Sequence, residues 1–256
     1  MHAVTGSPRQ VRIGTRRICT DDEQPTFWDR VEAGEWEPGT LRVLDEWLGP
    51  GSLFVDVGSW VGALSLYAAS LGAEVVALEA DPKALEQLRR NLAVNPELSR
   101  RITVVPRALA TSPGPVRMGA RRKAGNSMSS VLLGQGSSTS WTTDAITADE
   151  LAAEMREGRI DLLKIDIEGG EYALLPTLQP LLHQSSALLL ALHPDLLAES
   201  GDAEPAQTAR RALEPFHGWD IARVGPEGPA PAALDDVAAA GPAEWLFVRP
   251  DSARCG

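Results

Sequence analysis

Apolar residues gather in seven runs of the length expected for β-strands. The runs cover residues 53–57, 75–78, 102–105, 160–167, 187–192, 221–224 and 245–248. Helical patterns lie between several of them, as where Leu85, Leu88 and Leu92 repeat at i, i+3 and i+7. Asp81 and Pro82 before this stripe supply an N-cap and a proline at the first helical position. Alternating strands and helices predict an α/β fold with a mostly parallel sheet covered on both faces.

Other stretches depart from this alternation. Residues 1–48 precede the first strand and carry three tryptophans, so we predict an N-terminal helical cap segment on a main domain of residues 49–256. Residues 111–145 are rich in Gly, Ser, Thr and Arg, and a loop of this length is either disordered or functional, here on the substrate side. A Pro- and Ala-rich stretch, 226–242, predicts a surface loop, and two prolines within the leucine stripe of 174–182 predict an interrupted helix.

The amino-acid composition indicates in which cellular compartment the protein is expected. The chain has 256 residues and is 43% hydrophobic, which is ample for a packed core. No run approaches the roughly 18 apolar residues of a membrane span, and the first residues contain no apolar leader. Cys19 and Cys255 are too few for a disulfide framework. These features predict a cytoplasmic protein with no membrane partner.

The net charge of the chain indicates which kinds of binding partner are disfavoured. The formal net charge of -11 opposes binding to nucleic acid or to an anionic membrane surface. One local exception is the basic run formed by Arg117, Arg121, Arg122 and Lys123. The run is either a solvated loop or a clamp for an anionic substrate, and the sequence leaves both open.

A glycine-containing loop follows the first strand, where residues 54–62 read FVDVGSWVG. Glycines allow the backbone to approach a ligand closely, and Glu79, 21 residues after Gly58, stands where a carboxylate can bind both ribose hydroxyls. A dinucleotide fingerprint would have a second glycine where Trp60 stands, so tight contact with a pyrophosphate is disfavoured. A ligand with a ribose and no phosphates fits better, and S-adenosylmethionine is the leading candidate. Asp56 would then meet the amino-acid end of that cofactor.

Carboxylates and a histidine follow two later strands. Asp166 and Glu168 come where LLKIDIEGGEYALL leaves its apolar strand, and His193 ends the next strand in LALHPD. Ligands of open α/β sheets bind at the carboxyl ends of the strands, so these groups should converge. His193 is the best general base by its intrinsic pKa. There are two interpretations of Asp166. It lies beside the methyl group of S-adenosylmethionine and the hydroxyl that would accept that group, or it joins Glu168 and His193 in holding Mg²⁺.

Two further charged residues in this stretch have simpler interpretations. Glu171 fits the start of a helix, where a carboxylate complements the helix dipole. Lys164 precedes Asp166 by two positions on the same face and would balance the acids.

These blocks resemble the FkbM family of S-adenosylmethionine-dependent methyltransferases. The likeness is carried by FVDVGSWVG, ALEADP, DLLKIDIEGGEYALL and LLLALHPDLL, with FWDRVEAGEWEP and GNSMSSV as weaker parts. It implies a class I methyltransferase (Rossmann-like) fold. That fold is an α/β three-layer sandwich with a seven-stranded, mostly parallel sheet whose last strand is antiparallel. It also implies O-methylation of a hydroxyl on a small molecule such as a sugar, polyketide or other secondary metabolite.

The resemblance also assigns residues. Catalysis falls to His193, Asp166 and Glu168, and cofactor binding to Glu37, Asp56, Gly58, Ser59, Gly62, Glu79, Ala80, Ala108 and Asp166. Two departures stand out: Ser59-Trp60 replaces the Ala-Asn of many members, and Ala191 replaces a frequent Glu, whose role cannot be carried over.

Two rival functions share the fold. One is a non-catalytic nucleotide-binding module with a regulatory role, and the other is a dehydrogenase, which Trp60 disfavours. The expected partner is a small hydroxyl acceptor and not nucleic acid, while a homodimer and the identity of the acceptor are left open.

Overall fold

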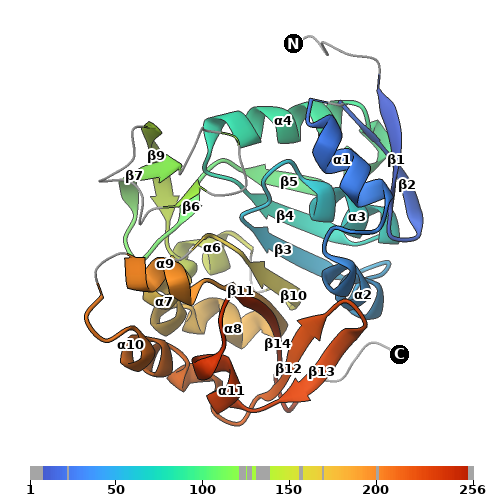
Figure 1. The fold of residues 1–256 in the computed structure, drawn as a ribbon. Coiled ribbons are helices and arrows are strands. Elements are labelled where there is room, and N and C mark those ends of the chain that lie inside the picture. The colour runs from blue at the N-terminus through green and yellow to red at the C-terminus, as the bar shows by residue number, and fades with distance from the viewer. Residues whose placement is uncertain are drawn as a thin grey trace.

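The computed structural model describes residues 8–21, 23–120, 125, 129–130, 139–155, 158–168, 170–199 and 202–252. An eight-stranded sheet crosses the molecule in the order β13-β12-β14-β11-β10-β3-β4-β5 (Figure 1). Its strands are β3 Leu53–Val57, β4 Glu74–Leu78, β5 Ile102–Val105, β10 Ile160–Ile165, β11 Ser185–Leu192, β12 Asp220–Gly225, β13 Gly228–Ala232 and β14 Ala243–Val248. Strands β11, β10, β3, β4 and β5 are parallel, whereas β14 is antiparallel to both β11 and β12. This is the class I methyltransferase architecture.

All seven predicted strands are present, and the last of them, β14, is antiparallel to β11 as expected. The predicted count of seven is one too low, because β13 adds an eighth strand at the edge. The prediction of a surface loop at residues 226–242 is wrong, because this stretch forms strand β13 and the helix α11, Leu234–Ala239. β13 pairs with β12 at the rim of the sheet, where Pro229 and Pro231 lie opposite Val224 and Ala222. An edge strand accepts prolines because one side of it needs no backbone donors.

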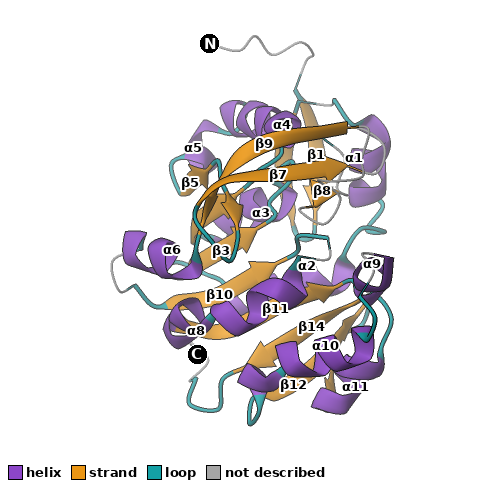
Figure 2. Ribbon diagram, turned by 90° about the vertical axis from the view of Figure 1, so that its left-hand side faces the viewer, coloured by secondary structure: helices purple, strands orange, loops and turns teal. Residues whose placement is uncertain are grey.

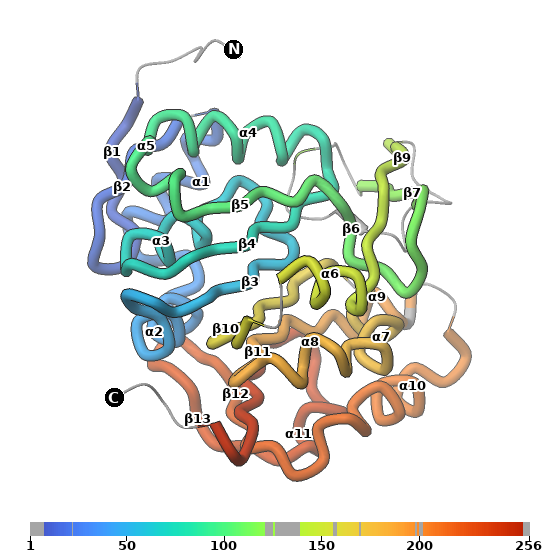
Figure 3. The backbone as a smooth tube through the Cα atoms, turned by 180° about the vertical axis from the view of Figure 1, so that it is seen from behind, coloured from blue at the N-terminus to red at the C-terminus, as the bar shows by residue number. Residues whose placement is uncertain are grey.

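Helices cover both faces and make the three layers. On one face lie α2 Pro38–Trp47, α3 Ala63–Leu71, α4 Pro82–Ala93 and α5 Pro96–Ser99. The other face carries α6 Ala148–Glu154, α7 Glu171–Leu174, the 3-10 helix Leu175–Thr177, α8 Gln179–Gln184 and α10 Pro205–Ala212, followed by the 3-10 helix Glu214–Phe216 and α11. Seen from behind, α6 and α8 lie over β10 and β11 (Figure 3). α9, Pro194–Glu199, follows β11 directly.

Each face has its own apolar core. Phe54, Leu162 and Leu189 pack against α2, α3 and α4, whereas Val55 and Leu163 point to the opposite face. The leucine stripe at 174–182 is broken into α7, a 3-10 turn and α8, as its prolines predict. At the start of α4 the side chain of Asp81 accepts hydrogen bonds from two backbone N–H groups, which confirms the predicted cap.

The N-terminal segment is only partly helical. β1 Arg9–Ile13 and β2 Arg16–Thr20 form an antiparallel hairpin, followed by α1 Pro25–Glu32 and α2. The predicted cap is therefore part hairpin. Val11, Ile13 and Ile18 alternate with exposed positions and join the core of the α3 face, which explains why this stretch forms strands.

Residues 111–145 were expected to be a loop, yet much of the described part is a second sheet. β6 Ala108–Leu109, β7 Gly114–Ala120, β8 Ser129–Ser130 and β9 Thr139–Ile146 pair in the order β6-β9-β7-β8. β7 and β9 run side by side (Figure 2). Arg121, Arg122 and Lys123 of the basic run, and most of GNSMSSV, lie outside the described residues.

Candidate functional site

Four residues meet at the carboxyl edge of the sheet, on the face covered by α2 and α3. Asp56 on β3 and Lys164 on β10 are directly paired, and both share the side of the sheet that carries Phe54. Ala191 on β11 is paired with Glu244 on β14. Because alternate residues of a strand share a face, the two pairs point to the same side. A carboxylate of β14 therefore stands opposite the Ala191 that marked a departure from the family pattern.

A cavity of about 590 Å³ opens at this edge. It is lined by Gln24, Thr26, Phe27, Arg30, Trp36, Glu37, Asp56, Gly58, Ser59, Trp60, Ala63, Leu64, Lys164, Asp166, Glu168, Ala191, His193, Ala243 and Glu244. Glu37, Trp60 and Glu168 are the non-glycine residues with left-handed backbone among those described, and all three line this cavity. Strained backbone of this kind concentrates at functional sites.

Lys164 is the centre of a buried charge cluster in the wall of this cavity. Its side chain is 3% exposed, and its Nζ donates to Oδ2 of Asp166 at 3.0 Å. Burial alone would lower the pKa of Lys164, but the charges of Asp166, Glu37, Asp56 and Glu244 raise it above its ordinary value. Lys164 is therefore firmly protonated and holds these carboxylates together.

The carboxylates around Lys164 respond differently. Burial raises the pKa of Glu37 to about 8, and also raises the pKa of Asp56 and Glu244, with Lys164 opposing it in each case. Burial acts in the same direction on Asp166, yet Lys164 and His193 together lower its pKa. Ser65 donates to Oδ2 of Asp56 at 2.5 Å. Asp166 is thus the ionised partner of Lys164, and Glu37 holds a proton at neutral pH.

The glycine loop after β3 needs its glycine for a steric reason. Gly58 has a φ of +85°, and a Cβ on it would lie 1.9 Å from the backbone oxygen of Asp166. The next turn brings Trp60, whose N–H donates to Oε2 of Glu79 at 2.7 Å while its indole donates to the carbonyl of Gly125 at 3.0 Å. The indole ring packs on Phe27, with centroids 4.5 Å apart. The loop therefore joins the two predicted halves of the cofactor site, Gly58 and Glu79.

A smaller cavity of about 60 Å³ lies on the other side of this loop. Glu79, Ala80 and Ala108 line it, while Gly58, Trp60, Asp166 and Glu168 line both cavities. Glu79 is 8% exposed and also accepts from the N–H of Asp81 at 2.7 Å. Burial raises the pKa of Glu79 to about 7, against the backbone hydrogen bonds from Asp81 and Trp60 that lower it.

The predicted cofactor residues thus divide between two cavities. Glu37, Asp56 and Ser59 line the larger one, and Glu79, Ala80 and Ala108 the smaller. Gly62 lines neither. Its φ of +82° and the 2.3 Å between its would-be Cβ and Leu88 give it a packing role. Ser59 is buried and its hydroxyl donates to the carbonyl of Leu78.

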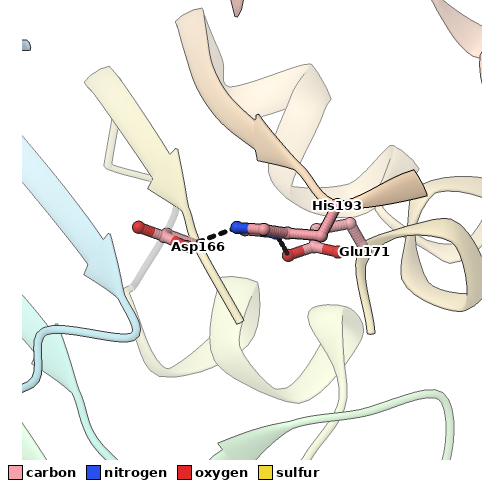
Figure 4. Close-up of side chains that lie close together, drawn as sticks. All are labelled: Asp166, Glu171 and His193. Carbon is pink, nitrogen blue, oxygen red and sulfur yellow. Dashed lines mark hydrogen bonds and ion pairs between the residues drawn. The ribbon is translucent and has the colours of Figure 1, made fainter. Parts of the chain in front are cut away.

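His193 stands between carboxylates at the edge of the larger cavity (Figure 4). Its Nδ1 lies 3.1 Å from Oε1 of Glu171, and its Nε2 lies 3.7 Å from Glu168 and 4.0 Å from Asp166. Burial lowers the pKa of His193, but the hydrogen bond to Glu171 and the surrounding negative charges raise it to about 9. His193 is therefore protonated at neutral pH in the free protein, which its intrinsic pKa did not indicate.

Glu171 does more than begin a helix. It is the first residue of α7, as predicted, but it is fully buried, and its Oε1 also accepts from the N–H of Ile167 at 3.2 Å. This carboxylate fixes the ring of His193 and directs Nε2 towards Asp166 and Glu168. The sequence offered no periodic signal for the contact, because the two residues lie on different elements and 22 positions apart.

The predicted Mg²⁺ set is only partly assembled. Ligand atoms of Asp166, Glu171 and His193 lie within 4.8 Å of one another. However, the ammonium of Lys164 already holds one oxygen of Asp166, and Glu171 holds Nδ1 of His193. Mg²⁺ prefers an oxygen-rich octahedral shell. The described residues therefore do not fit a magnesium site.

The fold and these cavities define a class I methyltransferase. The model of the methyltransferase FkbM domain matches residues 56–206, from Asp56 through the ends of β10 and β11. The chain therefore belongs to the FkbM methyltransferase family, a family of S-adenosylmethionine-dependent enzymes.

Curated relatives match over a short part. Ribosomal protein L11 methyltransferase from Carboxydothermus hydrogenoformans is 41% identical over 66 residues, 25% of this chain and 21% of that protein. The same enzyme from Geobacillus kaustophilus is 43% identical over 56 residues, 22% of this chain and 18% of that protein. The chain thus spans about a fifth of the length of these relatives.

Among solved structures, a candidate rRNA methylase from Clostridium thermocellum superposes with a TM-score of 0.51 and 9% identity, covering 84% of this chain and 95% of that one. An FkbM methyltransferase from Methylobacillus flagellatus gives a TM-score of 0.46 and 14% identity, over 84% of this chain and 51% of that one. The first likeness supports the fold alone. In the described part of the chain, no helix is both long and apolar enough to cross a membrane.

Proposed function

We propose that the protein transfers the methyl group of S-adenosylmethionine to a hydroxyl of a small-molecule acceptor. The observation that carries this proposal is the pair of cavities meeting at Gly58, Trp60, Asp166 and Glu168. The smaller one lies beside Glu79, whose carboxylate would accept from the ribose hydroxyls of the cofactor. The larger one has room for the amino-acid end of the cofactor and for an acceptor. When bound, S-adenosylmethionine supplies an electrophilic methyl group on a cationic sulfonium.

Oε2 of Glu79 accepts from the N–H of Trp60 and Oε1 from the N–H of Asp81, and the carboxylate keeps lone-pair capacity for a ribose hydroxyl. Asp56 offers an Oδ1 that is buried and has no partner, which suits the cofactor ammonium group. Through these two features the residues of this chain fit S-adenosylmethionine. Both come from the ends of neighbouring parallel strands, where open α/β sheets bind ligands.

His193 is the proposed general base. Its Nε2 faces the cavity, so it can accept the hydroxyl proton as the oxygen–methyl bond forms and the sulfur–methyl bond breaks. The raised pKa of His193 means that it must first lose a proton. The positive charge that a bound cofactor would bring into the cavity would disfavour the imidazolium and lower the pKa of His193. Asp166 and Glu168 position the acceptor, and Glu171 positions the imidazole.

The charge of the site favours a small acceptor over RNA. Five carboxylates line the larger cavity, namely Glu37, Asp56, Asp166, Glu168 and Glu244. The net charge of the chain is -11. Both features repel a polyanion. The rRNA methylase and the L11 methyltransferases share parts of this sequence or fold, so RNA and protein acceptors are the alternatives that an experiment must separate.

The N-terminal segment has a proposed place in this function. Phe27, Trp36 and Glu37 belong to residues 1–48 and line the larger cavity. We propose that this segment caps the active site of a methyltransferase domain formed by residues 49–256. Of the expected substrate-side stretch, 111–145, Met118 lines the smaller cavity and Gly125 binds the indole of Trp60.

The test uses S-adenosylmethionine labelled in its methyl group. The protein is incubated with the labelled cofactor and either the small-molecule, RNA or protein fraction of a bacterial extract. Label in the small-molecule fraction, recovered as an O-methyl product by mass spectrometry, is the expected result. Transfer to RNA or protein would contradict the acceptor class. Cofactor binding without transfer to any fraction would instead favour a regulatory nucleotide-binding module.

A further inference from the structure

Buried carboxylate oxygens without partners gather in the wall of the larger cavity. Oε2 of Glu37, Oδ1 of Asp56 and Oε1 of Glu244 are each buried and accept no hydrogen bond in the described structure. All three side chains line the cavity. A buried polar atom without a partner is costly, so such atoms are expected to meet a ligand. An ionised carboxylate accepts only, so a ligand that brings donors and a positive charge would replace the proton that Glu37 holds in the free protein.

The three oxygens come from different parts of the fold. Asp56 is the penultimate residue of β3, next to the glycine loop, and is the group expected to meet the cofactor. Glu244 lies on β14, which is separated from β3 by both β10 and β11. Strands are about 4.8 Å apart, which puts Glu244 on the order of 14 Å across the sheet from Asp56. Glu37 is the N-cap residue of α2, and the Thr40 hydroxyl of that helix donates to Oε2 of Glu244. Because Glu37 also interacts with Glu244, we place both carboxylates on the acceptor side of the cavity, in place of the cofactor role that the resemblance assigns to Glu37.

Charge balance indicates that the ligand is a cation. Lys164 is the one basic group buried within this cluster of described residues, and its Nζ is hydrogen-bonded to Asp166. Burial raises the pKa of Glu37 and of Glu244, and Lys164, which opposes this in both, also interacts with Asp166 and Asp56. One buried ammonium group therefore faces four carboxylates. Arg30 is exposed at the rim. The cofactor has a net charge of one, and its amino group is assigned to Asp56 at the other end.

Aromatic rings complete this side of the cavity. Phe27 and Trp36 pack edge to face with centroids 5.1 Å apart, and both line the cavity next to Glu37. Aromatic faces attract ammonium groups, and the attraction strengthens where water is excluded. Glu37 itself has a φ of +43°, a conformation that strains a non-glycine residue and places its carboxylate in this wall.

Resting on the function above, we propose that the methyl acceptor carries a protonated amine beside its hydroxyl, and that Glu37 and Glu244 bind this ammonium group. The substrate class is therefore an amino alcohol, with amino sugars as the compact members that suit the cavity. The ammonium donates to the free oxygens of the two carboxylates, while the hydroxyl faces His193 across the cavity.

The test compares glucosamine with N-acetylglucosamine, whose nitrogen is neutral, by isothermal titration calorimetry on protein saturated with S-adenosylhomocysteine. Wild-type protein should bind glucosamine at least about tenfold more tightly, the loss expected when one partner of a buried charge pair is removed. Glu244→Gln should abolish this preference without changing the affinity for S-adenosylhomocysteine. The exposed Glu227→Gln is the matched control and should keep the preference.

Three outcomes would overturn the inference. They are equal binding of the two sugars, binding of neither at millimolar concentration, and a preference that survives Glu244→Gln. A loss of S-adenosylhomocysteine affinity in Glu244→Gln would also overturn it, because Glu244 would then belong to the cofactor site. Failure of wild-type protein to bind S-adenosylhomocysteine would contradict the proposed function itself, so the two failures are distinguishable.

Discussion

Nδ1 of His193 lies 3.1 Å from Oε1 of Glu171, a carboxylate that is fully buried. This pair joins the end of β11 to the start of α7 and fixes which imidazole nitrogen faces the cavity. It also sets the charge of the site, since it is the strongest of the interactions that raise the pKa of His193 to about 9.

The first prediction concerns that pKa. Glu171→Gln removes the negative charge but keeps the shape, so the pKa of His193 should fall by about one to two units. Histidine NMR titration measures this directly. Glu168→Gln is the control, and should have a smaller effect because its oxygen lies 3.7 Å from Nε2. An unchanged His193 pKa in Glu171→Gln would contradict the assigned role.

The same pair makes folding stability depend on pH. The pKa of His193 is raised by folding, from about 6.5 unfolded to about 9. Its contribution is therefore fully present below pH 6.5 and is lost as the pH rises to 9. The free energy of unfolding should fall by at most about 3 kcal/mol from this source. Urea denaturation of wild-type protein and His193→Gln between these pH values tests this, and parallel curves would rule it out.

Lys164 should contribute strongly to the stability of the folded protein. Lys164→Met leaves Asp56, Asp166 and Glu244 without their buried cation, and we expect a loss of about 3–5 kcal/mol of stability. Lys83 is exposed on α4, so Lys83→Met should change the stability by less than about 0.5 kcal/mol. Thermal and urea denaturation measure both. A Lys164→Met protein as stable as the control would show that the cluster is not held by this ion pair.

Substitutions at Gly58 and Gly51 separate the steric cost of an added methyl group from the cost of a left-handed backbone. Gly58→Ala should destabilise the protein by about 3 kcal/mol, because the methyl group meets the backbone of Asp166 and the φ is left-handed. Gly51 has nearly the same φ, +88°, but no atom within 4 Å of its would-be Cβ. Gly51→Ala should therefore cost only about 1 kcal/mol. Equal losses in the two variants would contradict the close approach of the Asp166 backbone to Gly58.

Glu79 should make cofactor affinity pH-dependent. Its pKa is about 7, and only the carboxylate accepts from both ribose hydroxyls. Affinity for S-adenosylmethionine should therefore rise by up to about tenfold between pH 6 and 8. Glu79→Gln should bind weakly and with a flat pH profile. A wild-type profile as flat as that of the variant would place the ribose elsewhere.

The sequence predicts the strands of the main sheet well because their burial is read directly from runs of apolar residues. β13 is different: it is short, contains prolines and depends on pairing with β12, which no local pattern reveals. β7 and β9 were missed for a similar reason, since Gly, Ser and Thr dilute their alternation and their partners lie far apart in the chain.

Site residues that belong to motifs were predictable, and those assembled by topology were not. Asp166, Glu168 and His193 follow strands, so the carboxyl-edge rule finds them. Glu244 lies at the start of an antiparallel strand and reaches the site only because β14 inserts beside β11. Likewise, the protonation of His193 follows from Glu171, and a sequence alone does not show that contact.

The most direct test of the whole account is calorimetric titration of S-adenosylmethionine into wild-type protein and Glu79→Ala at pH 8. We predict one binding site in the wild type and at least about a tenfold loss of affinity in the variant, since a carboxylate hydrogen-bonded to both ribose hydroxyls is removed. Absence of binding to wild-type protein, or undiminished affinity in a folded Glu79→Ala protein, would contradict the account.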